Sequence, residues 1–257
     1  MFVRSALYRT AFIVCGLTVF SATAQQENRE PEAATGVYQQ QLVSSKQYMV
    51  SAAHPMATEA GRAVLAKGGS AVDAAIATQL MLGLVEPQSS GIGGGAFMLH
   101  WQAKQQHLTT FDGREMAPAA ATRDMFLVNG KADPELSRTG ALAVGVPGSV
   151  LALDKLRQLG AVLRWRDLIL PSAELADKGF LVSRSLAERL AATAPDLAKF
   201  PASAAIYLDD KQQPWDAGNT LKQADLAATY RAIAKQGAAY FYQGDFSRKT
   251  ERWMQLN

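Results

Sequence analysis

The sequence predicts a mixed α+β fold, because patterns typical of helices and patterns typical of strands occur along the same chain. Residues 55–67 carry apolar side chains at helical spacing, and residues 71–84 are apolar almost all round a helix. Residues 96–101 are an apolar run short enough to be a buried strand, and a second short run follows at 109–111. From residue 149 onward, helical spacing dominates again.

The N-terminal residues 1–24 have the three parts of a secretion signal peptide. Arg4 and Arg9 form the positive region, Ala11–Phe20 the apolar region, and Ala22–Ala24 a small-residue cleavage site before Gln25. The apolar region is shorter than the roughly 20 residues that a membrane-spanning helix requires. We therefore expect cleavage and export, to the periplasm or the medium, with no stable membrane anchor. Retention of the segment as an anchor is the alternative.

Composition excludes several kinds of function for the exported chain. Cys15 is the one cysteine and leaves with the signal, so the mature chain has no disulfide, no thiolate metal ligand and no thiol nucleophile. The formal net charge of +3 falls to +1 once Arg4 and Arg9 are removed. A balance this close to neutral indicates no nucleic-acid partner.

The next segment, residues 25–46, is polar and includes Pro31, Gly36 and Gln39–Gln41. This composition predicts a mobile leader before the folded region, residues 47–257. At the start of the folded region, Gln47–Ala53 is mixed apolar and predicts a first strand.

Two adjacent helices follow in the prediction. Pro55 suits the first turn of the first helix, and Gly68–Gly69 ends it. Ser70 caps the second helix, with Asp73 three positions on as its capping-box partner. Both helices are interpreted as core structure, with Ala71–Leu84 buried on several sides.

The remaining elements are predicted from turns, caps and helical spacing. Asn129–Gly130 and Asp133–Pro134 mark turns, and Val144–Gly148 is a glycine–proline corner that leads into a helix. Helices are predicted over residues 119–126, 149–159, 165–178, 183–192, 222–235 and from 245, with a loop-rich segment over 194–218. The last helix reaches Asn257 without a stop signal, so we expect the sequence to be interrupted there.

The segment Val85–Arg114 is predicted to carry the functional site. Four of the five residues of Gly91–Gly95 are glycine, which indicates positive φ angles, exposed N–H groups, or close approach of another backbone or a ligand. Arg114 comes just after the second strand-type run, where a strand delivers a side chain into a pocket. Because a guanidinium can bond both oxygens of a carboxylate, Arg114 is predicted to bind the carboxylate of a small amino-acid-like substrate. The alternative is a turn at Asp112–Glu115 with weak surface ion pairs.

Other catalytic and binding patterns are not met. His54, His100 and His107 are not spaced as metal ligands and are interpreted as satisfied core or surface residues. Ser89–Ser90 lacks the Gly-x-Ser-x-Gly elbow, and Gly91–Gly95 does not open a helix as a dinucleotide-binding loop does. We therefore expect no metal, no cofactor and no serine nucleophile.

Several motifs together resemble the N-terminal part of a γ-glutamyltransferase, also called γ-glutamyltranspeptidase or glutathione hydrolase. They occur in the family's order over nearly all of residues 47–257, at Met49–Ala52, Gly68–Ala75, Pro87–Met98, Asp112–Pro118, Ala121–Phe126, Gly145–Gly148 and Phe241–Gly244.

This resemblance implies an N-terminal-nucleophile hydrolase fold, an αββα sandwich of two stacked sheets between helical layers, of which only the N-terminal portion is present. It implies a precursor that cuts itself into a large and a small subunit, with a threonine at the front of the small subunit as nucleophile. That threonine takes the γ-glutamyl group from glutathione and passes it to water or an amino acid, and its own amine serves as base. The family's arginine for the substrate α-carboxylate matches Arg114.

The sequence departs from the family in length. The segment with the catalytic threonine has no counterpart before Asn257, and Thr109–Thr110 lies in the large-subunit part, so no catalytic residue is assigned. We expect a fragment that lacks the small subunit and is inactive alone. Two alternatives stay open: a non-catalytic periplasmic protein that binds glutamate or glutathione through Arg114, and a β-lactam acylase of the same fold.

Overall fold

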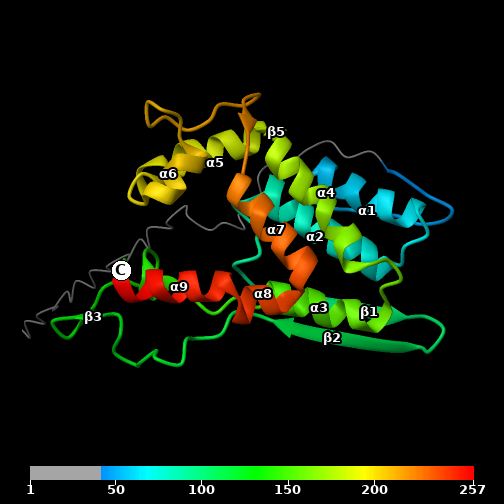
Figure 1. Ribbon diagram of the computed structural model, residues 1–257, viewed down its shortest axis with the longest axis horizontal. Coiled ribbons are helices and arrows are strands. Elements are labelled where there is room, and N and C mark those ends of the chain that lie inside the picture. Colours follow the sequence, from blue (N-terminus) through cyan, green and yellow to red (C-terminus); the bar gives the residue numbers. More distant parts are fainter. Residues whose placement is uncertain (1–41) are drawn as a thin grey trace, which may run out of the picture. The chain divides into compact units, whose positions relative to one another are not determined.

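The secondary structure of residues 42–257, the residues that the computed structural model describes, is predominantly helical, with three short antiparallel hairpins or strand pairs (Figure 1). The described residues all belong to one unit, Ala34–Asn257. In chain order the elements are α1 (Pro55–Ala66), α2 (Ala71–Val85), β1 (Ala96–Gln102), β2 (His107–Gly113), β3 (Leu127–Val128), β4 (Lys131–Ala132), the 3-10 helix η1 (Ala141–Ala143), α3 (Ser149–Gly160), α4 (Trp165–Lys178), β5 (Phe180–Leu181), α5 (Arg184–Leu197), α6 (Pro201–Tyr207), β6 (Thr220–Leu221), α7 (Ala224–Gln236), α8 (Ala238–Gln243) and α9 (Asp245–Leu256).

The core is built around α2, which contacts α1, α3 and α4, while α4 packs along α7. The prediction that α2 is buried on several sides is confirmed, because its buried residues are not confined to one stripe. On α7 the Tyr230 ring is fully buried, and its hydroxyl donates a hydrogen bond to the Leu80 carbonyl at 2.8 Å. This bond satisfies the Tyr230 hydroxyl, which the packing of α7 takes out of water.

The predicted capping box at the start of α2 is confirmed, and its acid has a second role. The Asp73 N–H donates to Ser70 Oγ at 3.2 Å, and the Asp73 carboxylate accepts from the Ser70 N–H at 2.8 Å. The same carboxylate, fully buried, accepts from the N–H groups of Val162 at 3.0 Å and Leu163 at 3.3 Å. A buried charge is tolerated when donors surround it. Asp73 therefore ties the α1–α2 turn to the loop between α3 and α4.

The hairpin of β1 and β2 has one covered face. α3 contacts both strands, and Met98 and Phe111 pack against the core beneath it. On the other face Phe97, Leu99 and Trp101 are 67%, 75% and 53% exposed. The expectation of a buried strand at 96–101 is therefore wrong for this face. Side chains alternate between the two faces of a strand, and within residues 42–257 only one of these faces has a layer against it.

Three other expectations for secondary structure are wrong. Gln47–Ala53 forms no strand, because no strand edge of the described residues pairs with it. Residues 119–126 form turns, since a short exposed segment lacks the packing that offsets the cost of starting a helix. The segment 194–218 is less loop-rich than expected, because α5 extends to Leu197 and Pro201 begins α6 at the first helical position, where proline is tolerated.

The predicted signal peptide, residues 1–24, lies outside the described residues, as does the predicted leader up to residue 41. Residues 42–46 are exposed and contain no helix or strand. No helix between residues 42 and 257 combines the length and the apolar character needed to cross a membrane.

His54 makes the start of α1 sensitive to pH. Its Nδ1 accepts the Met56 N–H at 3.2 Å, which only the neutral imidazole can do, and burial lowers the pKa of His54 below its usual 6.5. Between that lowered pKa and 6.5 the unfolded chain binds more protons than the folded chain. We therefore predict that the contribution of His54 to the free energy of unfolding is complete above pH 6.5 and is lost as the pH drops below it.

Urea unfolding across this pH range tests the effect, with His54→Asn as the matched control. Asparagine caps a helix through its side-chain oxygen and does not titrate. The His54→Asn protein should lose less stability than the wild type as the pH falls from neutral to mildly acidic. Parallel loss in the two proteins would assign the pH dependence to other groups.

Candidate active site

Three glycines bring the chain close together, at a crossing beside the predicted functional segment: Gly95 just before β1, Gly113 at the end of β2 and Gly148 at the N-cap of α3. Gly113, the last residue of β2, pairs with Ala96 at the open end of the hairpin. A Cβ atom on Gly148 would lie 2.0 Å from the Gly113 carbonyl oxygen, and one on Gly95 would lie 2.8 Å from the Arg114 Cα. Neither position has room for a side chain. The close approach of these backbones fixes where Arg114 leaves the strand.

Hydrogen bonds hold the same crossing together. The Gly94 carbonyl accepts the N–H groups of Gly148 and Ser149, both at 3.0 Å, so the glycine loop meets the first turn of α3. Close approach of another backbone, one of the reasons predicted for the glycine density, is therefore confirmed. Positive φ is the wrong reason, because none of the glycines in Gly91–Gly95 adopts a positive φ angle.

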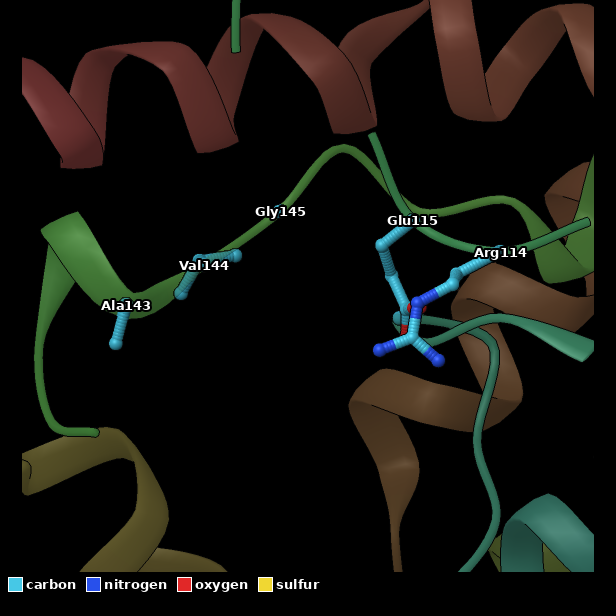
Figure 2. Close-up of a pocket in the computed structure, with 6 residues that line it drawn as sticks. Arg114, Glu115, Ala143, Val144 and Gly145 are labelled. Carbon is cyan, nitrogen blue, oxygen red and sulfur yellow. The ribbon is translucent and has the colours of Figure 1, made fainter. Parts of the chain in front are cut away.

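Arg114 is the first residue after β2, as expected from the sequence, and it lines a cavity. Its N–H donates to Asp112 Oδ1 at 3.0 Å, which fixes the turn at the strand end. The cavity measures about 480 Å³ and is lined by Arg114, Glu115, Gly93 and Ala143–Gly145. Figure 2 shows the Arg114 and Glu115 side chains together on one side, with Ala143 and Val144 across the opening. The volume falls within the range of about 300–1,000 Å³ that is usual for small-molecule sites.

The Arg114 guanidinium is free of protein partners within the described part of the chain. Across residues 42–257 it forms no ion pair, and its neighbours Asp112 and Glu115 do not bond it. The Glu115 carboxylate lies against the glycine loop, since a Cβ on Gly95 would be 2.7 Å from its Oε2. The alternative of a turn held by ion pairs at Asp112–Glu115 does not match this arrangement. A free guanidinium at a cavity is suited to a carboxylate or phosphate ligand.

The segment of residues 143–147, here called the wall, lines the cavity through Ala143–Gly145 and is fastened to the Arg114 strand end and to α8 through Val146 and Pro147. Val146 and Met116 exchange two backbone hydrogen bonds, at 3.1 Å and 2.8 Å. The Pro147 carbonyl accepts a hydrogen bond from the Tyr242 hydroxyl at 2.9 Å. That hydroxyl also accepts the Leu151 N–H of α3 at 3.0 Å. Sequence reasoning missed α8 as a helix and noted Tyr242 only within the Phe241–Gly244 motif.

The other candidate residues lie away from the cavity lining. The Ser89 and Ser90 N–H groups donate to the Glu86 carbonyl at 3.0 Å and 2.9 Å, so these serines form a turn after α2. His100 is not the satisfied histidine that was expected, because its buried Nδ1 has no hydrogen-bond partner among residues 42–257. In the same range no group of three or more His, Cys, Asp or Glu side chains is placed to hold a metal ion.

Residues 57–257 match the family model of gamma-glutamyltranspeptidase. The chain belongs to this family. It is 41% identical over 241 residues to the glutathione hydrolase proenzyme of Bacillus subtilis (strain 168), an alignment that covers 93% of this chain and 40% of the relative. The chain thus spans well under half the length of that relative. The predicted family is confirmed.

Solved structures with the same fold were also found. The gamma-glutamyltranspeptidase of Helicobacter pylori superposes with a TM-score of 0.82 at 34% identity, covering 84% of this chain and 62% of that one. The cephalosporin acylase from Bacillus halodurans superposes with a TM-score of 0.69 at 25% identity, covering 86% and 43%. The predicted α+β N-terminal-nucleophile hydrolase fold class is confirmed. Within residues 42–257 each sheet has two strands, so these residues do not form the stacked pair of sheets of the expected αββα sandwich.

Alanine substitutions test whether the glycines are needed because the backbones pack closely. Gly148→Ala places a methyl group against the Gly113 carbonyl and is predicted to destabilise the chain by about 2–3 kcal/mol. Gly93→Ala, in the same site, meets no atom within 4 Å and should change stability by less than about 0.5 kcal/mol. Urea unfolding of the two variants measures the difference. Equal losses would show that the crossing is not tight in solution.

Proposed function

We propose that the Arg114 pocket binds the α-carboxylate of a γ-glutamyl compound such as glutathione, and that this chain is the substrate-holding part of a γ-glutamyltransferase and glutathione hydrolase. The observation that carries the proposal is the unpaired guanidinium on a cavity of about 480 Å³. Family membership supplies the reaction class. The greater likeness to glutathione hydrolases than to the cephalosporin acylase favours a γ-glutamyl over a β-lactam substrate.

The chemistry follows from the shape of the substrate. A γ-glutamyl group has its α-carboxylate at one end and the reactive amide at the other. Two parallel hydrogen bonds from Arg114 fix the carboxylate, and the apolar Ala143 and Val144 offer contact for the methylene groups between the ends. The position of the amide is then set by the length of the substrate.

The attacking group does not come from the cavity lining. None of the six lining residues carries a hydroxyl or a thiol. We therefore infer that the nucleophile is the threonine at the front of a small subunit, in line with the family resemblance, and that this chain alone binds substrate without turning it over. The rival function, a binding protein without catalysis, shares the binding step and lacks the partner subunit.

Export completes the proposal. Residues 1–24 carry the positive, apolar and cleavage regions of a secretion signal, and we infer delivery to the periplasm or medium. Mass spectrometry of the protein recovered from the periplasmic fraction should show an N-terminus at Gln25. Recovery of an uncleaved chain with the membranes would contradict this part of the proposal.

Binding measurements on the wild type and two variants test the role of Arg114. Arg114→Ala should weaken glutathione binding by about tenfold or more, because a hydrogen-bonded charge pair contributes roughly 1.5–3 kcal/mol. Arg114→Lys keeps the charge but loses the planar pair of donors, so its glutathione affinity should lie between those of the wild type and Arg114→Ala. Since the side chain has no protein partner among the described residues, the midpoint of thermal unfolding should not change. Calorimetry with glutathione checks the affinities, and equal affinity in all three proteins would remove Arg114 from the site.

The same preparations should release no p-nitroaniline from γ-glutamyl-p-nitroanilide above the background rate. Turnover by the chain alone would contradict the assignment of the nucleophile to a partner subunit.

A further inference from the structure

We propose that Tyr242 is a positioning residue for the Arg114 pocket, because its hydroxyl fixes the backbone of residues 143–147, the wall opposite the guanidinium. The consequence for ligand binding rests on the proposed function of the pocket. The effect on the wall itself can be measured in the chain without ligand.

The Tyr242 hydroxyl uses both of its hydrogen-bonding capacities on distant backbone. It donates to the Pro147 carbonyl at 2.9 Å and accepts the Leu151 N–H at 3.0 Å, across 95 and 91 residues of sequence. Leu151 is the third residue of α3, where helix N–H groups have no helical acceptor. Gly148 at the N-cap has no side chain to supply one. Tyr242 therefore caps α3 from another helix and, with the same atom, holds the end of the wall.

The tyrosine ring is itself held in place by aromatic neighbours. Phe241 is 2% exposed, meets the Tyr242 ring edge-on at 5.2 Å between centroids, and stacks on Phe246 at 4.1 Å. Such contacts fix ring orientation. Burial raises the pKa of Tyr242 above its usual 10.0, with the Leu151 N–H acting in the opposite direction, so the phenol keeps its proton at neutral pH. The donor to Pro147 is therefore present at neutral pH.

The wall depends on these hydrogen bonds more than on burial. Val144 is 37% and Val146 44% exposed, so neither valine anchors the wall by burial. Val146, next to Pro147, is bonded to Met116, two residues beyond Arg114. A Cβ atom on Gly145 would lie 3.0 Å from the Glu115 Cβ, which leaves little slack between the wall and the Arg114 strand end. Loss of the Tyr242 hydroxyl removes the bond at Pro147, one of the supports of the wall beside the Val146–Met116 pair, and we expect the wall to loosen relative to Arg114.

Amide hydrogen exchange in the ligand-free 257-residue chain tests the positioning directly. Tyr242→Phe keeps the ring and removes the hydroxyl, and we expect the Leu151 and Val146 amides to exchange about fivefold faster, since the bond contributes on the order of 1 kcal/mol. Tyr240→Phe is the matched control, because Tyr240 lies on the same helix and its hydroxyl has no hydrogen bond to residues 42–257. Unchanged exchange at Val146 in Tyr242→Phe would overturn the proposal.

Glutathione affinity, measured below the unfolding transition of every variant, separates positioning from simple stabilisation. Tyr242→Phe should weaken binding about fivefold, while Tyr240→Phe should not. When Tyr242→Phe is combined with Arg114→Lys, the further loss of glutathione affinity should be smaller. The position of the wall matters less once the bidentate guanidinium is replaced. Faster exchange with unchanged affinity would overturn the link to the pocket. Absence of glutathione binding by the wild type would contradict the proposed function, and the exchange result would still decide the role of Tyr242.

Discussion

The site depends on one steric constraint, the close crossing of backbone at Gly95, Gly113 and Gly148. At this crossing the start of β1, the end of β2 and the first turn of α3 approach within distances that exclude a Cβ atom. The hairpin therefore cannot slide along α3, and the residue that follows β2 emerges at one place. Arg114 is that residue. Its position is a property of the backbone, so its side chain needs no partner in the protein to hold the strand end there.

The electrostatics of Arg114 differ from those of the structural arginines. Arg62, Arg157 and Arg164 each pair with a carboxylate three residues away on their own helix or at its start. Such pairs use up the guanidinium and contribute little to stability when exposed. Arg114 sits between two acids in sequence and bonds neither side chain with its guanidinium. The Asp112 carboxylate accepts the Arg114 backbone N–H, and Glu115 lies against the glycine loop. Neither acid forms an ion pair with Arg114 among the described residues, so the guanidinium keeps its hydrogen-bond donors for the proposed ligand.

Features set by neighbouring residues could be predicted from the sequence, and features set by distant residues could not. The Ser70–Asp73 capping box and the glycine stops at Gly179 and Gly237 are local, and the structure shows each of them. The bonds from Asp73 to Val162 and from Tyr242 to Pro147 join segments about 90 residues apart, and no local pattern reports them. The exposed face of β1 is a third kind of case. Because side chains alternate along a strand, the sequence shows which residues of β1 share a face. It does not show which of the two faces another part of the chain covers.

Sequence reasoning proposed Arg114 as a binding residue but did not find the segments that surround it in the structure. Arg114 was identified from its place after a strand-type run and from the family motif, and the structure puts it on a cavity. The wall at 143–147 was predicted only as a glycine–proline corner, because the pairing of Val146 with Met116 depends on the tertiary fold. The bond between the wall and α8 was also missed, because α8 is too short for its helical periodicity to show in the sequence.

The most direct measurement of the central claim compares two ligands on two proteins. Glutathione and an analogue whose glutamyl α-carboxylate is converted to an amide are titrated into the wild type and into Arg114→Ala. If the guanidinium binds that carboxylate, the amide analogue binds the wild type about tenfold or more weakly, and Arg114→Ala does not distinguish the two ligands. An equal penalty for the amide in both proteins would show that the α-carboxylate is bound elsewhere and would contradict the account.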